Sequence, residues 1–160
     1  MKKQKKIPKD ITDRIANARY YLDASRKLPF RSYTGLKILS LLTAWENLTI
    51  AEEEMSAWIR KIPVSKKLYK SHVYKLKNVR KPIERIVIKN GRAHTTIYAN
   101  GTELNKLLSI CRYGSKSCSK NIEEIFVGRE WITDEFERGL ESRISWEEMS
   151  VKMFEKLLNQ

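Results

Sequence analysis

Residues 34–62 read TGLKILSLLTAWENLTIAEEEMSAWIRKI, and their apolar side chains recur at the period of an α-helix. At 100° per residue, one side of this helix carries Leu41, Trp45, Leu48, Met55 and Ile59. Five more residues widen that side into a broad stripe, namely Ile38, Leu42, Ala44, Ala51 and Trp58. The stretch therefore predicts one long helix against which the rest of the chain packs.

Glu52 is the residue that does not fit this pattern. Its direction falls near the middle of the apolar arc, whereas Glu46 and Glu53 share one edge of the stripe. A carboxylate that faces a core must be paired or protonated, because burying an isolated charge is costly. Glu52 therefore marks a candidate site.

Helical spacing also predicts a helix on each side of the long one. The first begins at Asp10 or Thr12 and runs to Lys27, and Pro29 then stops it. Another runs from Val64 to Val79, with a ridge of lysines on one face and His72 in the centre of the apolar face. The short connections indicate that neighbouring helices run antiparallel.

The period changes after Pro82. Two β-branched runs flank Asn90-Gly91, which is a strong signal for a β-hairpin over about residues 84–98. Further on, Thr133 can begin a helix to Leu140, and Ser145 with Glu148 resembles a capping box for a last helix. The apolar residues of that last helix are Trp146, Met149, Met153, Phe154 and Leu157.

These elements predict a mainly α fold, an antiparallel helical bundle with one inserted β-hairpin. Residues 1–9 carry five lysines and are expected to form a basic mobile tail, and residues 10–160 a single domain. The basic N-terminal segment is not followed by an apolar signal sequence, and no apolar run is long enough to span a membrane. With two cysteines, Cys111 and Cys118, the sequence favours reduced thiols in a cytoplasmic protein without a metal site or a cofactor.

Charge is the main compositional indication of function. The chain has 32 Lys and Arg against 19 Asp and Glu, a net charge of +13, and residues 60–92 hold twelve of the basic residues with one acid, Glu84. Such a patch favours a polyanionic partner, either RNA or DNA. The expected phosphate contacts come from Lys66, Lys70, Lys77, Lys81, Arg85, Lys89 and Arg92.

A catalytic interpretation rests on two titratable residues. If the apolar faces of their helices meet, Glu52 and His72 form a buried pair that could support general acid–base chemistry. The alternative is a structural polar pair without a chemical role.

The sequence LLTAWENLTIAEEEMSAW, followed after a break by Ser71-His72-Val73-Tyr74-Lys75, resembles the AbiV-type abortive-infection branch of the HEPN superfamily over about residues 10–80. In this resemblance His72 and Lys75 match a His-x-x-Lys element, and either Glu46 or Glu52-Glu53 matches the acidic element. It implies an antiparallel helical domain, frequently dimeric, that acts in RNA cleavage, nucleotide transfer or antiviral defence. Its His-x-x-Lys element adds Lys75 to Glu52 and His72 as a candidate catalytic residue. The ribonuclease motif of the superfamily has an arginine four to six residues before the histidine, where this chain has Lys67.

The leading hypothesis is accordingly a basic intracellular protein that interacts with nucleic acid and could act in antiviral defence. The first alternative is a degenerate HEPN-like ribonuclease that acts through His72, although lysine lacks the planar two-point grip of arginine on a phosphate. The second alternative is a homodimer that binds a partner without catalysis.

Overall fold

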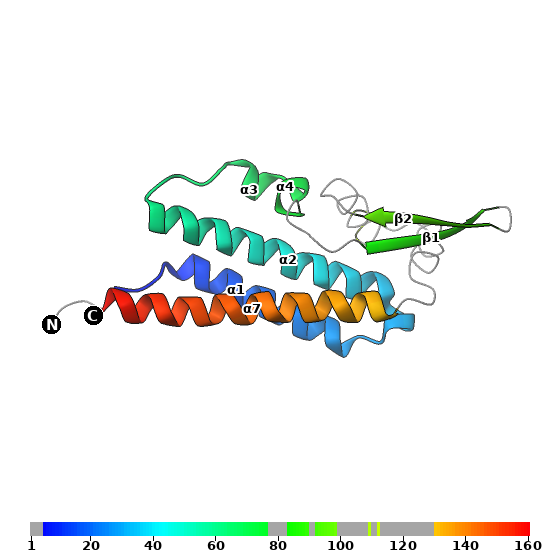
Figure 1. Ribbon diagram of the computed structural model, residues 1–160, viewed down its shortest axis with the longest axis horizontal. Coiled ribbons are helices and arrows are strands. Elements are labelled where there is room, and N and C mark those ends of the chain that lie inside the picture. Colours follow the sequence, from blue (N-terminus) through cyan, green and yellow to red (C-terminus); the bar gives the residue numbers. More distant parts are fainter. Residues whose placement is uncertain (1–4, 77–82, 90–91, 99–108, 110–111, 113–129) are drawn as a thin grey trace.

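In the computed structural model, the chain is described over residues 5–76, 83–89, 92–98, 109, 112 and 130–160 (Figure 1). Three long helices lie side by side: α1 (Lys9–Lys27), α2 (Phe30–Arg60) and α7 (Glu130–Leu158). Two short helices, α3 (Lys67–Lys70) and α4 (His72–Leu76), follow α2, and α4 packs on it. The strands β1 (Ile83–Lys89) and β2 (Arg92–Tyr98) pair antiparallel, with Val87 opposite His94 and Lys89 opposite Arg92.

Helix α2 is bounded by identifiable backbone features. Pro29 occupies its N-cap position, where its fixed φ is tolerated, and the first turn is kinked at Tyr33. At the other end Lys61 adopts a left-handed conformation with φ of 56°, and the Ile62 N–H donates to the Ala57 carbonyl at 3.0 Å. This bond satisfies a carbonyl of the last turn and ends the helix before Pro63.

The core confirms the helical periods of the first half of the chain. Ile11, Ile15, Ala18 and Leu22 of α1 are buried, as are most of the predicted stripe residues of α2. The exceptions are Trp58, which is partly buried against the core, and Ile59, which is 45% exposed at the end of α2. Phe136, Leu140 and Ile144 of α7 complete the core, and Phe136 stacks on Trp45 with ring centroids 5.2 Å apart.

The directions of the three long helices follow from residues that contact each other. Lys37 meets Glu137 near the start of α2, and Glu52 meets Arg143 further along, so α2 and α7 run parallel. Helix α1 runs opposite to both, since Ser25 lies beside Glu137 whereas Arg19 lies beside Glu148. The predicted antiparallel order therefore holds for α1 against α2 but does not extend to α2 and α7.

Three other sequence predictions differ from the structure. Residues 64–79 do not form one helix, because Ser71 is extended and its hydroxyl accepts the Tyr74 N–H at 3.1 Å, which caps a separate α4. Residues 133–158 belong to one helix rather than two, because Ser145 and Glu148 bind Arg19 of α1 instead of capping. The expected tail of residues 1–9 is partly docked, since Ile7 is buried and Lys5 hydrogen-bonds Asn159.

One buried polar cluster joins all three long helices. The Lys37 ammonium lies 2.7 Å from the Glu137 carboxylate and donates to the Ser25 carbonyl at 2.9 Å. The Ser25 hydroxyl donates to the same carboxylate at 3.0 Å, and all three residues are buried. Each charge is therefore both paired and hydrogen-bonded, which is the condition under which a buried ion pair is tolerated.

We expect Glu137→Gln to lower the free energy of unfolding by about 3–5 kcal/mol, because it leaves the Lys37 ammonium buried without a counter-charge. Urea denaturation followed by circular dichroism measures this loss. Asp13→Asn, which removes the exposed ion pair of Asp13 with Lys9 on α1, is the matched control and should leave the stability nearly unchanged. Equal losses in the two variants would contradict the role of the cluster.

Candidate functional site

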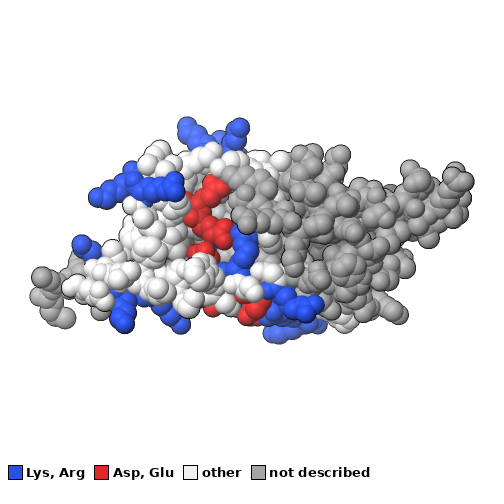
Figure 2. Space-filling model, viewed as in Figure 1, with Lys and Arg blue, Asp and Glu red and all other residues white. Residues whose placement is uncertain are grey.

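Three glutamates on one face of α2 hold the α3–α4 segment. Glu53 and Glu54 lie seven and eight residues after Glu46, which places all three along one side of the helix. Glu54 accepts a hydrogen bond from the Tyr69 hydroxyl at 2.7 Å, and Glu53 accepts one from the Tyr74 hydroxyl at 3.0 Å. Figure 2 shows acidic side chains gathered in a band across one face of the molecule.

Burial together with the Glu54 carboxylate raises the pKa of Tyr69 to about 12. The phenol therefore stays protonated at neutral pH and remains a donor to Glu54. This bond fixes α3 on α2 and thereby restricts where α4 can lie.

Glu46 is the most buried of the three and lies at the centre of the candidate site. Its residue surface is 5% exposed, and its Oε1 lies 2.5 Å from His72 Nδ1. Its Oε2 lies 3.4 Å from the ammonium of Lys75, which is also buried. The carboxylate is thus compensated by Lys75 on one oxygen while it binds the imidazole through the other.

The other nitrogen of His72 faces Arg112, with Nη1 3.1 Å from Nε2. A guanidinium can only donate, so Nε2 must act as the acceptor and carry its lone pair. The proton of the neutral ring is then on Nδ1, from which it is donated to Glu46. The two contacts select one tautomer, and about a third of the His72 side-chain surface remains accessible to solvent.

This arrangement corrects the predicted partner of His72. The Glu52–His72 pair is wrong, because Glu52 binds Arg143 of α7 at 2.6 and 2.8 Å. Glu46 and Glu52 are six residues apart, which turns their side chains about 120° away from each other on the helix. Arg143 also lies over the Trp45 ring, 4.2 Å from its centroid, so it joins the carboxylate to the core.

Only part of the predicted phosphate-binding set can be placed. Lys66 and Lys70 are exposed and lie four residues apart on one helical segment, since Lys66 is the N-cap residue of α3 and Lys70 ends it. The predicted ridge does not continue as one helix, because the break at Ser71 follows them. Lys77 and Lys81 lie outside the described residues. The structure places the backbone of the remaining three residues in β1 and β2 but does not describe their side chains. These residues are Arg85, Lys89 and Arg92.

Described basic residues occur on several parts of the surface, and one group of them lies where α2 ends and α3 follows. Five of them are exposed between the end of α2 and the end of α3, namely Arg60, Lys61, Lys66, Lys67 and Lys70. We call these five residues the basic turn. They lie shortly before His72 in the chain, and Figure 2 shows basic side chains that protrude near this end of the molecule.

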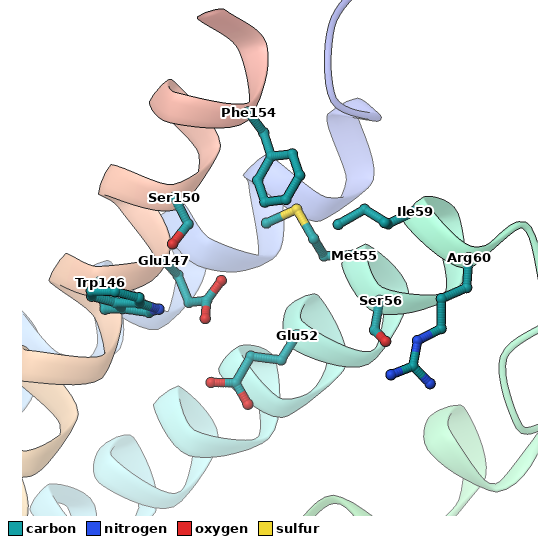
Figure 3. A pocket seen from close by; sticks show the side chains of 9 residues that line it. All are labelled: Glu52, Met55, Ser56, Ile59, Arg60, Trp146, Glu147, Ser150 and Phe154. Atoms are coloured by element: carbon teal, nitrogen blue, oxygen red, sulfur yellow. The ribbon is translucent and has the colours of Figure 1, made fainter. Parts of the chain in front are cut away.

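A second candidate site is a pocket of about 330 Å³ between α2 and α7. Met55, Ile59 and Phe154 supply apolar walls, and the Glu52 and Glu147 carboxylates face each other across the gap (Figure 3). Burial, with a smaller effect of the Glu52 charge, raises the pKa of Glu147. Among the described residues Glu147 has no hydrogen-bond or ion-pair partner.

The described part of the chain offers little for two other kinds of function. It contains no group of three or more His, Cys, Asp or Glu side chains placed to hold a metal ion. Within the same residues, no helix combines the length and apolar character needed to cross a bilayer.

The raised pKa of Glu147 predicts a pH-dependent effect of Glu147→Gln. Because the folded-state pKa lies above the unfolded value, ionisation of Glu147 opposes folding above the folded pKa, and this penalty disappears as the pH falls below the unfolded value. We expect the variant to be more stable than the wild type at pH 7 and equal to it at pH 3. Thermal unfolding at the two pH values measures the difference, and Glu148→Gln, which weakens the contact with Arg19, should instead be destabilised at pH 7.

Comparison of the whole chain with protein-family models, with curated protein sequences and with solved structures gives no match in any of the three.

Proposed function

We propose that this protein binds nucleic acid, in line with its net charge of +13, and that the basic turn contributes to the binding. The observation that supports this proposal most directly is the exposure of five cationic side chains within eleven residues, Arg60 to Lys70. Lysines and arginines of this kind contact phosphates and position a nucleic acid without reading its sequence. Five further residues would extend the same contacts, namely Lys77, Lys81, Arg85, Lys89 and Arg92.

The proposal predicts a steep dependence of affinity on salt, because each neutralised phosphate releases counterions. We expect Lys66→Gln/Lys70→Gln to weaken binding of a fluorescent single-stranded RNA and to reduce the slope of log K against log salt by about 1.4, or about 0.7 for each lost contact. Fluorescence anisotropy between low and high salt measures the slope.

Lys6→Gln/Lys27→Gln removes the same charge from exposed positions outside the basic turn and is the matched control. It should leave the slope nearly unchanged. Binding that is independent of salt, or an equal loss in both variants, would reject the basic turn as the binding surface.

The contacts of His72 favour a second and more specific candidate, cleavage of RNA. With Nδ1–H bound to the buried Glu46 carboxylate, Nε2 carries the lone pair that a general base needs. Arg112 donates to this lone pair, so it would have to turn from Nε2 to a bound phosphate before Nε2 could take a proton. The ribonuclease motif implied by the HEPN resemblance has an arginine where this chain has Lys67. Arg112 would supply the guanidinium from a distant part of the sequence.

In this reaction Nε2 removes the proton of a ribose 2′-hydroxyl, and the 2′-oxygen attacks the adjacent phosphorus. The bond from phosphorus to the 5′-oxygen breaks, that oxygen takes a proton from water, and the imidazolium then returns its proton to the solvent. The products are a 2′,3′-cyclic phosphate and a 5′-hydroxyl. Glu46 and Lys75 act as positioning residues, since Glu46 holds the imidazole and Lys75 compensates the buried carboxylate.

We expect His72→Ala to lower the rate of RNA cleavage at least about 100-fold, the contribution typical of a general base. Product analysis by gel and mass spectrometry detects the cyclic phosphate, and circular dichroism checks the fold. Tyr20→Phe, which changes an exposed residue of α1 that makes none of the His72 contacts, is the control. Cleavage unchanged in His72→Ala would eliminate this candidate, whereas RNA binding without turnover in the wild type would leave only the binding function.

Antiviral defence and a homodimeric state are proposals that rest on the resemblance. Expression of the chain in bacteria challenged with phage, beside the His72→Ala variant, tests the first. Sedimentation equilibrium of the full chain, whose monomer mass is 18.8 kDa, tests the second.

A further inference from the structure

The C-terminal half of α7 carries apolar side chains that no described residue covers. Trp146 is 63% exposed, Met149 47%, Met153 57% and Leu157 60%. We call these four residues the outer stripe. They face away from the core, because the buried face of the same helix is supplied by another set, Phe136, Leu140 and Ile144.

The outer stripe is contiguous along the helix. Its members follow one another at intervals of three, four and four residues, so at 100° per residue their directions fall within an arc of about 80°. Exposed apolar side chains that adjoin one another, rather than lying scattered singly, indicate an interaction surface. Methionine and tryptophan are also among the residues enriched in such surfaces.

The outer stripe borders the groove between α7 and α2. Trp146 lines one side of the pocket described above, and Ile59, which is 45% exposed, lines the other side (Figure 3). Large apolar side chains from two helices thus flank a shallow groove. This shape fits an amphipathic helix that lies along the groove with its apolar face inward.

The edge of the outer stripe away from α2 is basic, whereas the edge towards α2 carries both signs, with Glu147 beside Arg143, which is paired with Glu52. Lys152 and Lys156 are exposed. On the helix their side chains lie next to those of Met149 and Met153, on the edge of the stripe away from α2. On the edge towards α2 lies Glu147, which has no partner among the described residues. A partner helix that complements both edges carries acidic side chains along one flank and a basic side chain on the other.

The same charges disfavour an antiparallel second copy of this chain on the outer stripe. An antiparallel copy related by a two-fold axis would bring each lysine edge against the lysine edge of the partner subunit, because such an axis pairs each edge with itself. The net charge of +13 adds a general repulsion between two copies. A helix of opposite charge meets neither obstacle.

We propose that the outer stripe of α7 is a docking surface for an acidic amphipathic helix of another protein. Its apolar face contacts Trp146, Met149 and Met153, and its acidic flank lies against Lys152 and Lys156. The inference does not depend on the proposed function, because the outer stripe lies on α7, whereas His72 and the basic turn belong to other elements.

A synthetic peptide can test the proposal on the full chain. The probe is a fluorescein-labelled helix of about 18 residues, or five turns, with leucine on one face, glutamate on one flank of it and a single lysine on the other. We expect saturable binding in fluorescence anisotropy, and Met149→Lys should weaken it at least about tenfold, because it places a charge at the centre of the contact. Leu36→Lys changes a residue of α2 that is 50% exposed outside the stripe, and this matched control should bind as the wild type does.

Charge reversal tests the chemistry of the partner. Lys152→Glu/Lys156→Glu should lose the glutamate peptide and bind a version in which each glutamate is replaced by lysine. Lys66→Gln/Lys70→Gln in the basic turn should bind the glutamate peptide unchanged, which separates this surface from the proposed nucleic-acid contacts.

Four outcomes would overturn the proposal. The first is absence of binding to the glutamate peptide, and the second is equal affinity of the wild type for the glutamate and lysine peptides. The third is a wild-type dimer in sedimentation equilibrium that Met149→Lys dissociates and Leu36→Lys does not, since it would assign the outer stripe to a second copy. The fourth is binding to phosphatidylserine vesicles that is lost in Met149→Lys, since it would assign the stripe to a lipid surface.

Discussion

The pairing of the glutamates on α2 is the constraint on which the arrangement of the molecule depends. Helix α2 is packed on by α1, α4 and α7, and each of its four glutamates meets a donor on a neighbouring element. Glu52 binds α7 through Arg143, whereas the other three bind the α3–α4 segment through His72, Tyr74 and Tyr69. Because a carboxylate buried without a partner is costly, these bonds determine where α4 can lie.

Local periodicity is sufficient to predict the helices that pack by their apolar stripes. Most of the buried residues of α1 and α2 follow from spacing, because the period of 3.6 residues indicates which face is covered. Prolines indicate where the two helices end, but α2 begins at Phe30 rather than at the predicted Thr34. The break at Ser71 could also be predicted from local sequence. A serine hydroxyl can accept a hydrogen bond from a backbone N–H that follows it, and serine therefore favours the start of a helix over its interior. The continuous α7 is not, because Ser145 and Glu148 make a local capping pattern that Arg19, far away in the sequence, overrides.

The candidate site shows the same division between local and distant information. Sequence reasoning singles out His72 and places a glutamate of the long helix beside it, but the partner is Glu46 rather than Glu52. That choice depends on the rotation of α4 after Ser71, which no spacing within residues 64–79 specifies. Arg112 is a more extreme case, because it lies 40 residues from His72 along the chain and no local pattern links the two.

Helix α7 explains why an amphipathic pattern identifies apolar side chains but not what covers them. The pattern predicts that five apolar residues of its C-terminal half are buried. Of these five, only Phe154 packs against the core, and the other four form the exposed outer stripe. A helix with two apolar faces can pack its inner face against the core of its own domain. Its outer face then remains exposed and can contact a partner. The lysines beside the outer stripe then limit what that partner can be, because a chain of the same charge meets repulsion where an acidic helix meets attraction. Because the Glu46–His72 contact is made on a different face of α2 from the one that Arg143 binds, the proposed partner binding and the proposed RNA cleavage can be tested separately by substitution.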